Sequence, residues 1–182
     1  MVVKSFLEIV NKISMNLQTL SAKPEYDPAF VEAARTRLEG AATCEDAREA
    51  IREIVANLIG SEQMALFEID YSKAIMWQRW SYGIDRRVSG PIDLIAYPEL
   101  YRALQGEILT FPEPANIGCF PQQVSAIAPI PADEVPAGLL VLFGMLPQKE
   151  LLTHTDREVL AVLSAVSIRA ISDETPPGGV QP

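Results

Sequence analysis

The chain has 182 residues, enough for one well-packed domain with a few additional helices and too few for two domains of ordinary size. Hydrophobic residues make up 48% of it and charged residues 21%, which excludes a wholly disordered chain. Its formal net charge is −9, so nucleic acids and acidic membrane surfaces would repel it, and we expect neither as a partner. The longest apolar run, over 137–146, is far shorter than the roughly 20 residues that cross a bilayer.

The reactive side chains are few. The two cysteines, Cys44 and Cys119, follow a first segment without the pattern of a secretory signal peptide, and this favours a reducing, cytoplasmic setting. A zinc site needs about four ligands at short spacings, whereas the cysteines lie far apart and His154 is the one histidine. We therefore expect no metal site and no catalytic role for His154.

The first expected element is a helix over residues 1–22, in which apolar residues recur at alternating steps of three and four. They are Val3, Phe6, Val10, Ile13, Leu17 and Leu20. Pro24 ends this helix because proline clashes with a continuing helix. A seam of this kind must be covered by another helix, either the last helix of the same chain or one from a second copy. We expect a homodimer formed through the N- and C-terminal helices.

Two further helices are expected before the first strand. The second has Asp27 as its N-cap and Gly40 as a left-handed terminator. Its inward-facing residues are Phe30, Ala34 and Leu38. The third begins at Thr43, which forms a capping box with Asp46, and ends at Gly60.

From residue 63 the apolar pattern becomes that of extended chain. Residues 64–70 and 74–82 predict a β-hairpin with a turn at 71–73. Because side chains alternate along a strand, each face of the second strand should carry a tryptophan. One face would hold Met76, Gln78, Trp80 and Tyr82, and the other Ile75, Trp77, Arg79 and Ser81.

The second half of the chain predicts one more helix, three strands and a closing helix. These are a helix over 97–105, strands over 107–111, 124–130 and 137–143, and a last helix that continues to residue 171. The last two strands are mostly apolar and should be central, while the proline-containing stretch 112–123 should be a loop. Thr155 and Glu158 predict the capping box of the last helix. Residues 173–182 should form a disordered tail. This order predicts an α+β fold with an antiparallel sheet.

Within this order, five segments resemble those of a GAF domain, a small sensory module. They are Ala65–Asp70, Tyr101–Leu109, Ser125–Ile130, Gly138–Phe143 and Leu152–Leu163. The resemblance covers residues 43–172 and leaves residues 1–42 as an N-terminal helical extension. It implies five or six antiparallel strands with helices behind them and a ligand cavity on the other face. Residues 92–104 and 112–123 would roof this cavity.

The resemblance leaves the ligand and any cofactor unknown, because members of the family bind cyclic nucleotides, tetrapyrroles, haem, small anions or amino acids, and some bind nothing. We expect the ligand-binding residues to be Trp77, Arg79, Tyr82, Tyr97, Tyr101 and Cys119. An Arg79 directed into the cavity would favour an anionic ligand, while a solvated basic patch is the alternative.

Three functions stay open. The first is a non-enzymatic, bacterial sensory or regulatory protein that binds a small molecule and signals through its helices to a protein partner. The second is a ligand-free interaction module. The third is a redox enzyme that uses Cys119, like the free methionine sulfoxide reductases, although those use several pocket cysteines. A photoreceptor is not expected, since bilin-binding relatives have a histidine where this chain has Phe120.

Overall fold

The computed structural model describes residues 27–84, 88, 90–131, 136–147, 149 and 151–166. Its elements in chain order are α2 (Pro28–Glu39), α3 (Cys44–Ile54), the π-helical segment η1 (Val55–Ile59), β1 (Met64–Asp70), β2 (Ile75–Tyr82), β3 (Ile92–Asp93), α4 (Pro98–Leu104), β4 (Leu109–Ala115), β5 (Val124–Ile130), β6 (Gly138–Leu142) and α5 (His154–Val166). The helix expected over residues 1–22 and the tail expected over 173–182 lie outside the described residues.

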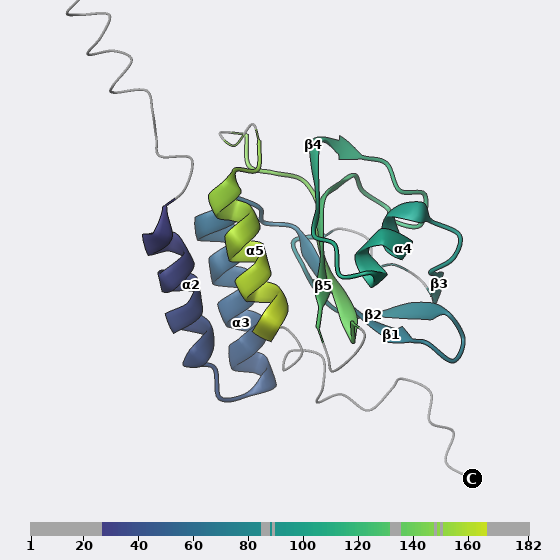
Figure 1. The fold of residues 1–182 in the computed structure, drawn as a ribbon, viewed down its shortest axis with the longest axis horizontal. Helices are drawn as coiled ribbons and strands as arrows, with labels where there is room; N and C mark the ends of the chain where they lie inside the picture. Colours follow the sequence, from purple (N-terminus) through teal and green to yellow (C-terminus); the bar gives the residue numbers. More distant parts are fainter. Residues whose placement is uncertain are drawn as a thin grey trace, which may run out of the picture.

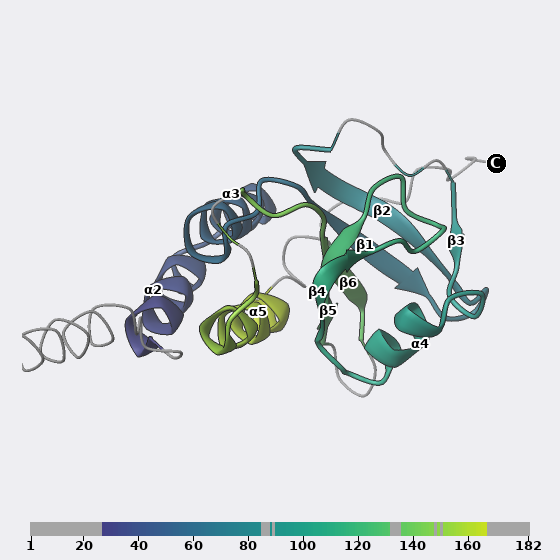
Figure 2. The same cartoon turned by 90° about the horizontal axis from the view of Figure 1, so that it is seen from above.

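The strands form one antiparallel sheet in the order β3-β2-β1-β6-β5-β4. Helices α2, α3 and α5 lie together on one side of this sheet, and α4 lies on the other (Figure 1, Figure 2). The predicted α+β fold is therefore confirmed, as is the interior position of the apolar strands β5 and β6. In the part of the chain that the structure describes, no helix has the length and hydrophobicity that a membrane crossing requires.

The caps of α3 agree with the sequence, and those of α2 agree in part. Thr43 and Asp46 form the expected capping box, and Gly60 ends η1 with a φ of 84°. Asp27 caps α2, but Gly40 is right-handed, with a φ of −73°, and is not a left-handed terminator. The expected inward position of Phe30 is also wrong. Phe30 is 42% exposed, because the buried face of α2 follows steps of three and four through residues 31, 34 and 38, and Phe30 is one residue away from it.

The N-cap of helix α5 lies two residues earlier than expected, at Thr153. Thr153 and Asp156 form its capping contacts, with the Asp156 N–H donating to Thr153 Oγ1 at 3.3 Å and the Thr153 hydroxyl donating to Asp156 Oδ2 at 2.7 Å. Two overlapping Thr-x-x-acid patterns occur here, and the second threonine has another role. The Oγ1 of buried Thr155 accepts a hydrogen bond from the Asp27 N–H at 2.8 Å. This bond connects the start of α2 to the start of α5.

The hairpin of β1 and β2 forms as expected, whereas two edge features differ from the prediction. The short strand β3 pairs with β2 at residues 75 and 76 and was not predicted, because two residues are too few for a periodic pattern. Strand β4 continues to Ala115, through residues that predict a loop. Pro112 and Pro114 are accommodated because β4 is the last strand in the sheet order and its register is irregular between Thr110 and Ala115.

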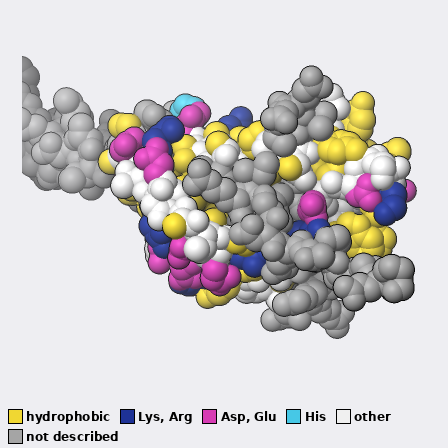
Figure 3. Space-filling model, turned by 90° about the horizontal axis from the view of Figure 1, so that it is seen from below, with side chains coloured by type: hydrophobic (Ala, Val, Ile, Leu, Met, Phe, Trp, Pro, Cys, Tyr) yellow, Lys and Arg dark blue, Asp and Glu magenta, His cyan; other side chains and the backbone are white. Residues whose placement is uncertain are grey.

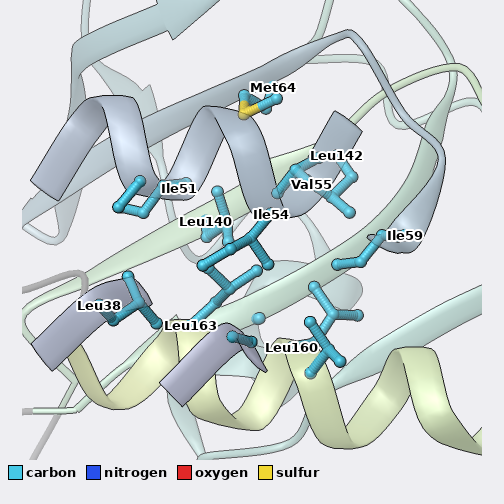
Figure 4. Packing of buried hydrophobic residues seen from close by; sticks show 14 of the residues in the cluster. Leu38, Ile51, Ile54, Val55, Ile59, Met64, Leu140, Leu142, Leu160 and Leu163 are labelled. Carbon is cyan, nitrogen blue, oxygen red and sulfur yellow. The ribbon is translucent and has the colours of Figure 1, made fainter. Parts of the chain in front are cut away.

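The sheet separates two hydrophobic cores. The helix-side core joins α2, α3, η1 and α5 to alternate residues of β1, β5 and β6 (Figure 4). Its labelled members are Leu38, Ile51, Ile54, Val55, Ile59, Met64, Leu140, Leu142, Leu160 and Leu163. The second core, on the side of α4, uses the other face of the same strands, and we call it the α4-side core. Its members include Phe67, Met76, Leu94, Leu100, Leu109, Ile117, Phe120, Ile127, Val141 and Phe143.

Candidate functional site

A β-bulge in β2 determines where the predicted site residues lie. Leu66 pairs with Trp80 and Phe67 pairs with Gln78, so Arg79 is an extra residue in β2. Cross-strand partners share a face of the sheet, and the bulge reverses the alternation on one side of it. The two faces expected from strict alternation are therefore wrong. Trp77, opposite Glu68, is on the same side as Trp80, which packs against the helix-side core.

Three of the six predicted ligand-binding residues thus lie on the helix side of β2, namely Trp77, Arg79 and Tyr82. Trp77 is 38% exposed and Tyr82 is 40% exposed, and we call the surface formed by these two residues the aromatic face. The guanidinium of Arg52, on α3, lies 5.2 Å from the centroid of the Tyr82 ring. Figure 3 shows from below that acidic side chains gather over the helices and that hydrophobic side chains are more frequent over the other half of the molecule.

Arg79 is held beside the aromatic face by a carboxylate. Its Nε and Nη2 donate to Oε2 of Glu68, and its side chain is 8% exposed. A buried guanidinium that is already paired with a carboxylate has its charge neutralised locally. The argument for an anionic ligand required an Arg79 directed into the cavity, and this condition is not met.

The other three predicted residues are on the side of α4. Tyr97 and Cys119 are partly buried and pack against the α4-side core, whereas Tyr101 is 57% exposed. A Cβ at Gly118 would lie 3.7 Å from Tyr97 Cε1, so the loop that carries Cys119 runs directly past the tyrosine ring. The structure therefore brings Tyr97 and the Cys119 loop together and separates them from Trp77, Arg79 and Tyr82.

The region where the resemblance implies a ligand cavity is occupied by aromatic side chains of the chain itself. The ring of Phe120 lies 5.5 Å from that of Phe67 and 5.7 Å from that of Phe143, measured between centroids. Phe67 and Phe143 are fully buried and Phe120 is 6% exposed. Phe120 comes from the loop after β4, so a segment expected to roof the cavity contributes a side chain to the α4-side core.

The environment of Cys119 disfavours the thiolate. Burial, with a smaller contribution from the negative charge of Glu99, raises the pKa of the Cys119 thiol to about 11. The other cysteine, Cys44, is the first residue of α3, on the opposite side of the sheet, so the two thiols cannot cooperate across the protein. Within the described ranges, no group of three or more metal-binding side chains is found.

A cleft of about 540 Å³ lies elsewhere, between the end of α4, the start of β4 and the first turns of α5. We call it the β4–α5 cleft, and it is lined by Arg102, Gly106, Glu107, Ile108, Leu109, Thr110, Phe111, Arg157, Glu158 and Ala161. The Arg157 Nη2 donates to Thr110 Oγ1 at 2.7 Å and so connects α5 to β4. The Arg102 guanidinium donates to both carboxylate oxygens of Glu107. This hydrogen bonding lowers the pKa of Glu107, with further lowering from the charges of Arg102 and Arg157.

Sequence reasoning missed this cleft because three elements from distant parts of the chain form it. Arg102 and Glu107 flank a glycine turn and could have been noticed as a pair. The position of Arg157 is set by the packing of α5 on the sheet, for which a single sequence carries no signal.

Comparison with known proteins identifies the fold. The sequence matches no family model, and no curated protein is similar to it in sequence. Among solved structures, the GAF domain of a phosphoenolpyruvate-protein phosphotransferase from Acinetobacter has a TM-score of 0.59 at 14% identity, over 75% of this chain and 87% of that one. A GAF domain/HD domain protein from Geobacter sulfurreducens has a TM-score of 0.56 at 13% identity, over 74% and 95%.

A third similar structure is an enzyme. The free methionine-R-sulfoxide reductase of Neisseria meningitidis, solved in complex with its substrate, has a TM-score of 0.51 at 10% identity, over 77% of this chain and 87% of that one. At these identities the likeness concerns the fold alone. The chain has a GAF-like fold, and the expected resemblance is confirmed at that level.

Proposed function

We propose that this chain is a regulatory module that acts by binding another protein and performs no catalytic step. The packing of the α4-side core supports this proposal, because Phe120 is buried against Phe67 and Phe143 on the side of the sheet where the resemblance implies a ligand cavity. Protein interiors are close-packed, so a ligand could enter only by displacing this side chain. A module without a ligand must exert its effect through its surface.

The similar structures support a regulatory role. In the Acinetobacter protein the GAF domain is one part of a phosphotransferase, and in the Geobacter protein it is combined with an HD domain. A fold used in this way serves the activity of other domains, and we infer that the present chain serves a separate protein in the same manner.

The aromatic face is the surface that we propose for docking. Tryptophan, tyrosine and arginine are enriched among residues that dominate binding energy at interfaces, and Trp77 and Tyr82 are large and partly exposed. The guanidinium of Arg79, which lies between these residues in the sequence of β2, is already paired with Glu68. A partner could therefore cover this surface without leaving a buried cation unpaired.

Two measurements on the full chain test the proposal. Native mass spectrometry of the purified protein should show the bare polypeptide mass, and a stoichiometric bound molecule would contradict a ligand-free module. In cross-linked capture from the source cells, Trp77→Ala should lose its partner, whereas Tyr101→Ala, which removes an exposed aromatic side chain from α4, should retain it. Equal capture by both variants, or capture of nothing by the unaltered chain, would argue against docking through the aromatic face.

Small-molecule sensing is the second candidate. Tyr97 and the Cys119 loop lie together at the margin of the α4-side core, and the Neisseria enzyme with the same fold was solved with its substrate. Sensing would require Phe120 to swing out when the ligand binds, so the ligand would have to prefer that arrangement. A molecule retained in native mass spectrometry and lost on Tyr97→Ala would favour this candidate over the first.

A redox function of Cys119 has the least support. The thiolate is the nucleophile in cysteine chemistry, and a pKa near 11 leaves very little of it at neutral pH. The test is turnover of free methionine sulfoxide with a thiol reductant. Activity in the unaltered chain that disappears in Cys119→Ser would reinstate the enzyme.

We also propose that the chain forms a homodimer through residues 1–22. The apolar seam in these residues has the spacing of a helix that packs against another helix. Helix α2 follows directly and has a shallow outer groove formed by Ala29, Ala33 and Gly40. Light scattering should show a dimer that Ile13→Glu dissociates and that Gln18→Glu, one position outside the seam, leaves intact. A monomeric unaltered chain would refute the dimer.

A further inference from the structure

The formal charges of the side chains that line the β4–α5 cleft add up to zero. Two arginines, Arg102 and Arg157, and two glutamates, Glu107 and Glu158, line it, so their formal charges cancel in a protein of net charge −9. A simple anion would be attracted by the arginines and repelled by the glutamates, and the reverse holds for a simple cation. A molecule with separated charges of both signs complements such a cleft better than either.

The positive end of the cleft is Arg157. Its guanidinium is oriented by the neutral hydroxyl of Thr110, at 2.7 Å, and this contact uses one of the five N–H donors that a guanidinium carries. Arg102, by contrast, is engaged at two nitrogens by Glu107. Arg157 is therefore the arginine best placed to receive a carboxylate, with the fork geometry that such pairs favour.

The negative end of the cleft and its apolar wall lie beside Arg157. Glu158 follows Arg157 on α5, and its Oε1 lies 4.0 Å from Nδ1 of His154. Ile108 and Phe111 of the β4 side and Ala161 of α5 supply an apolar surface within the same cleft. A carboxylate, an ammonium and an apolar body can thus be accommodated together.

The edge of β4 argues for a small molecule over an added strand. Strand β4 is the last strand in the sheet order, and an extended peptide could in principle pair with it. Pro112 and Pro114 lack N–H donors and interrupt such pairing directly after the residues that line the cleft. The volume of about 540 Å³ suits a compact organic molecule.

We propose that the β4–α5 cleft binds a small zwitterion with an apolar body, in which the carboxylate pairs with Arg157 and the ammonium with Glu158. The cleft borders the α4-side core at Leu109 but is lined neither by Phe120 nor by the residues of the aromatic face, so the proposal stands independently of the protein-docking function. A zwitterion bound here would join α5 to β4 and could reinforce the link that Arg157 and Thr110 already form.

The test uses L-leucine as the probe, together with two analogues that each lack one charge. 4-Methylpentanoate has no ammonium, and 3-methylbutylamine has no carboxylate. In calorimetric titrations of the full chain, leucine should bind saturably, and each analogue should bind about tenfold more weakly or worse, since each loses one charge-assisted contact. Equal binding of leucine and 4-methylpentanoate would overturn the zwitterion assignment, as would the failure of all three probes to bind.

Variants then locate the site. Arg157→Gln and Glu158→Gln should each weaken leucine binding about tenfold. Arg35→Gln is the matched control, because Arg35 is an exposed arginine on α2 with a glutamate partner 3.8 Å away. Since Arg157 also connects two elements, the melting temperature of each variant is recorded, and Glu158→Gln keeps the test valid if Arg157→Gln unfolds. Leucine affinity that is unchanged in both variants would place the binding elsewhere and refute the proposal.

Discussion

Replacing Phe120 by alanine tests the packed interior on which the proposed function depends. The side chain is 6% exposed and lies between the rings of Phe67 and Phe143. An aromatic side chain of this kind buries about 150 Å² or more, which corresponds to about 4 kcal/mol at roughly 25 cal/mol per Å². Buried Phe→Ala substitutions cost about 3–5 kcal/mol, and the loop position of Phe120 allows partial collapse, so we expect about 3 kcal/mol.

The assay is urea unfolding followed by tryptophan fluorescence, with a thermal scan beside it. A loss of about 3 kcal/mol should lower the melting temperature by about 6–12 °C in a domain of this size. Phe30→Ala is the control, because Phe30 is 42% exposed and its removal should cost less than about 1 kcal/mol. The cavity left by Phe120→Ala should also bind benzene-sized apolar molecules that the unaltered chain rejects. A cost below that of Phe30→Ala would show that Phe120 does not fill the interior.

Three further predictions concern single positions. Gly83 has a φ of 68°, and a Cβ there would lie 1.8 Å from a backbone carbonyl oxygen, so Gly83→Ala should lower the free energy of unfolding by about 3 kcal/mol or more. Gly106→Ala, at a φ of 86° in open space, should cost about 1 kcal/mol, and equal losses for the two would contradict the close approach. Asp156→Asn should cost about 2 kcal/mol in urea unfolding, because its buried carboxylate accepts the capping hydrogen bonds and pairs with a lysine, and an unchanged midpoint would refute that role. In a Cys44→Ser variant, Cys119 should be alkylated more slowly than in the urea-unfolded chain, and the alkylation rate should rise toward pH 11. Because the pKa of Cys119 is higher in the folded state, the stabilisation of the fold by the neutral thiol is complete below about pH 9 and is lost above it. Fast alkylation of the folded variant at pH 7 would disprove the raised pKa.

Local chemistry made much of the fold predictable. The Thr43 and Asp46 capping box depends on two side chains and the backbone between them, and the sequence displays all of it. The strands Val124–Ile130 and Gly138–Leu142 are buried on both faces, and this burial is visible as continuous apolar sequence. Such features need no knowledge of distant parts of the chain.

The features that were not predictable depend on which segments meet. The hydroxyl of Thr155 looked free to cap α5, but the Asp27 N–H from the other end of the chain uses it. Strand β4 tolerates Pro112 only because no described strand lies beyond it. The predicted site residues lie on two sides of the sheet for a similar reason. The extra residue Arg79 is defined by the pairing of β2 with β1, and the sequence of β2 alone carries no periodic signal of it.

The bulge at Arg79 also determines how β2 would respond to a change in length. Gln78 and Trp80 already lie opposite neighbouring residues of β1, so removing Arg79 would restore strict alternation and leave the other residues of β2 on their present faces. Trp77 would stay on the helix side, and Trp80 would stay packed against the helix-side core. A related chain one residue shorter at this point should therefore keep the same polarity pattern along both halves of the strand, and it would lack the cation that pairs with Glu68.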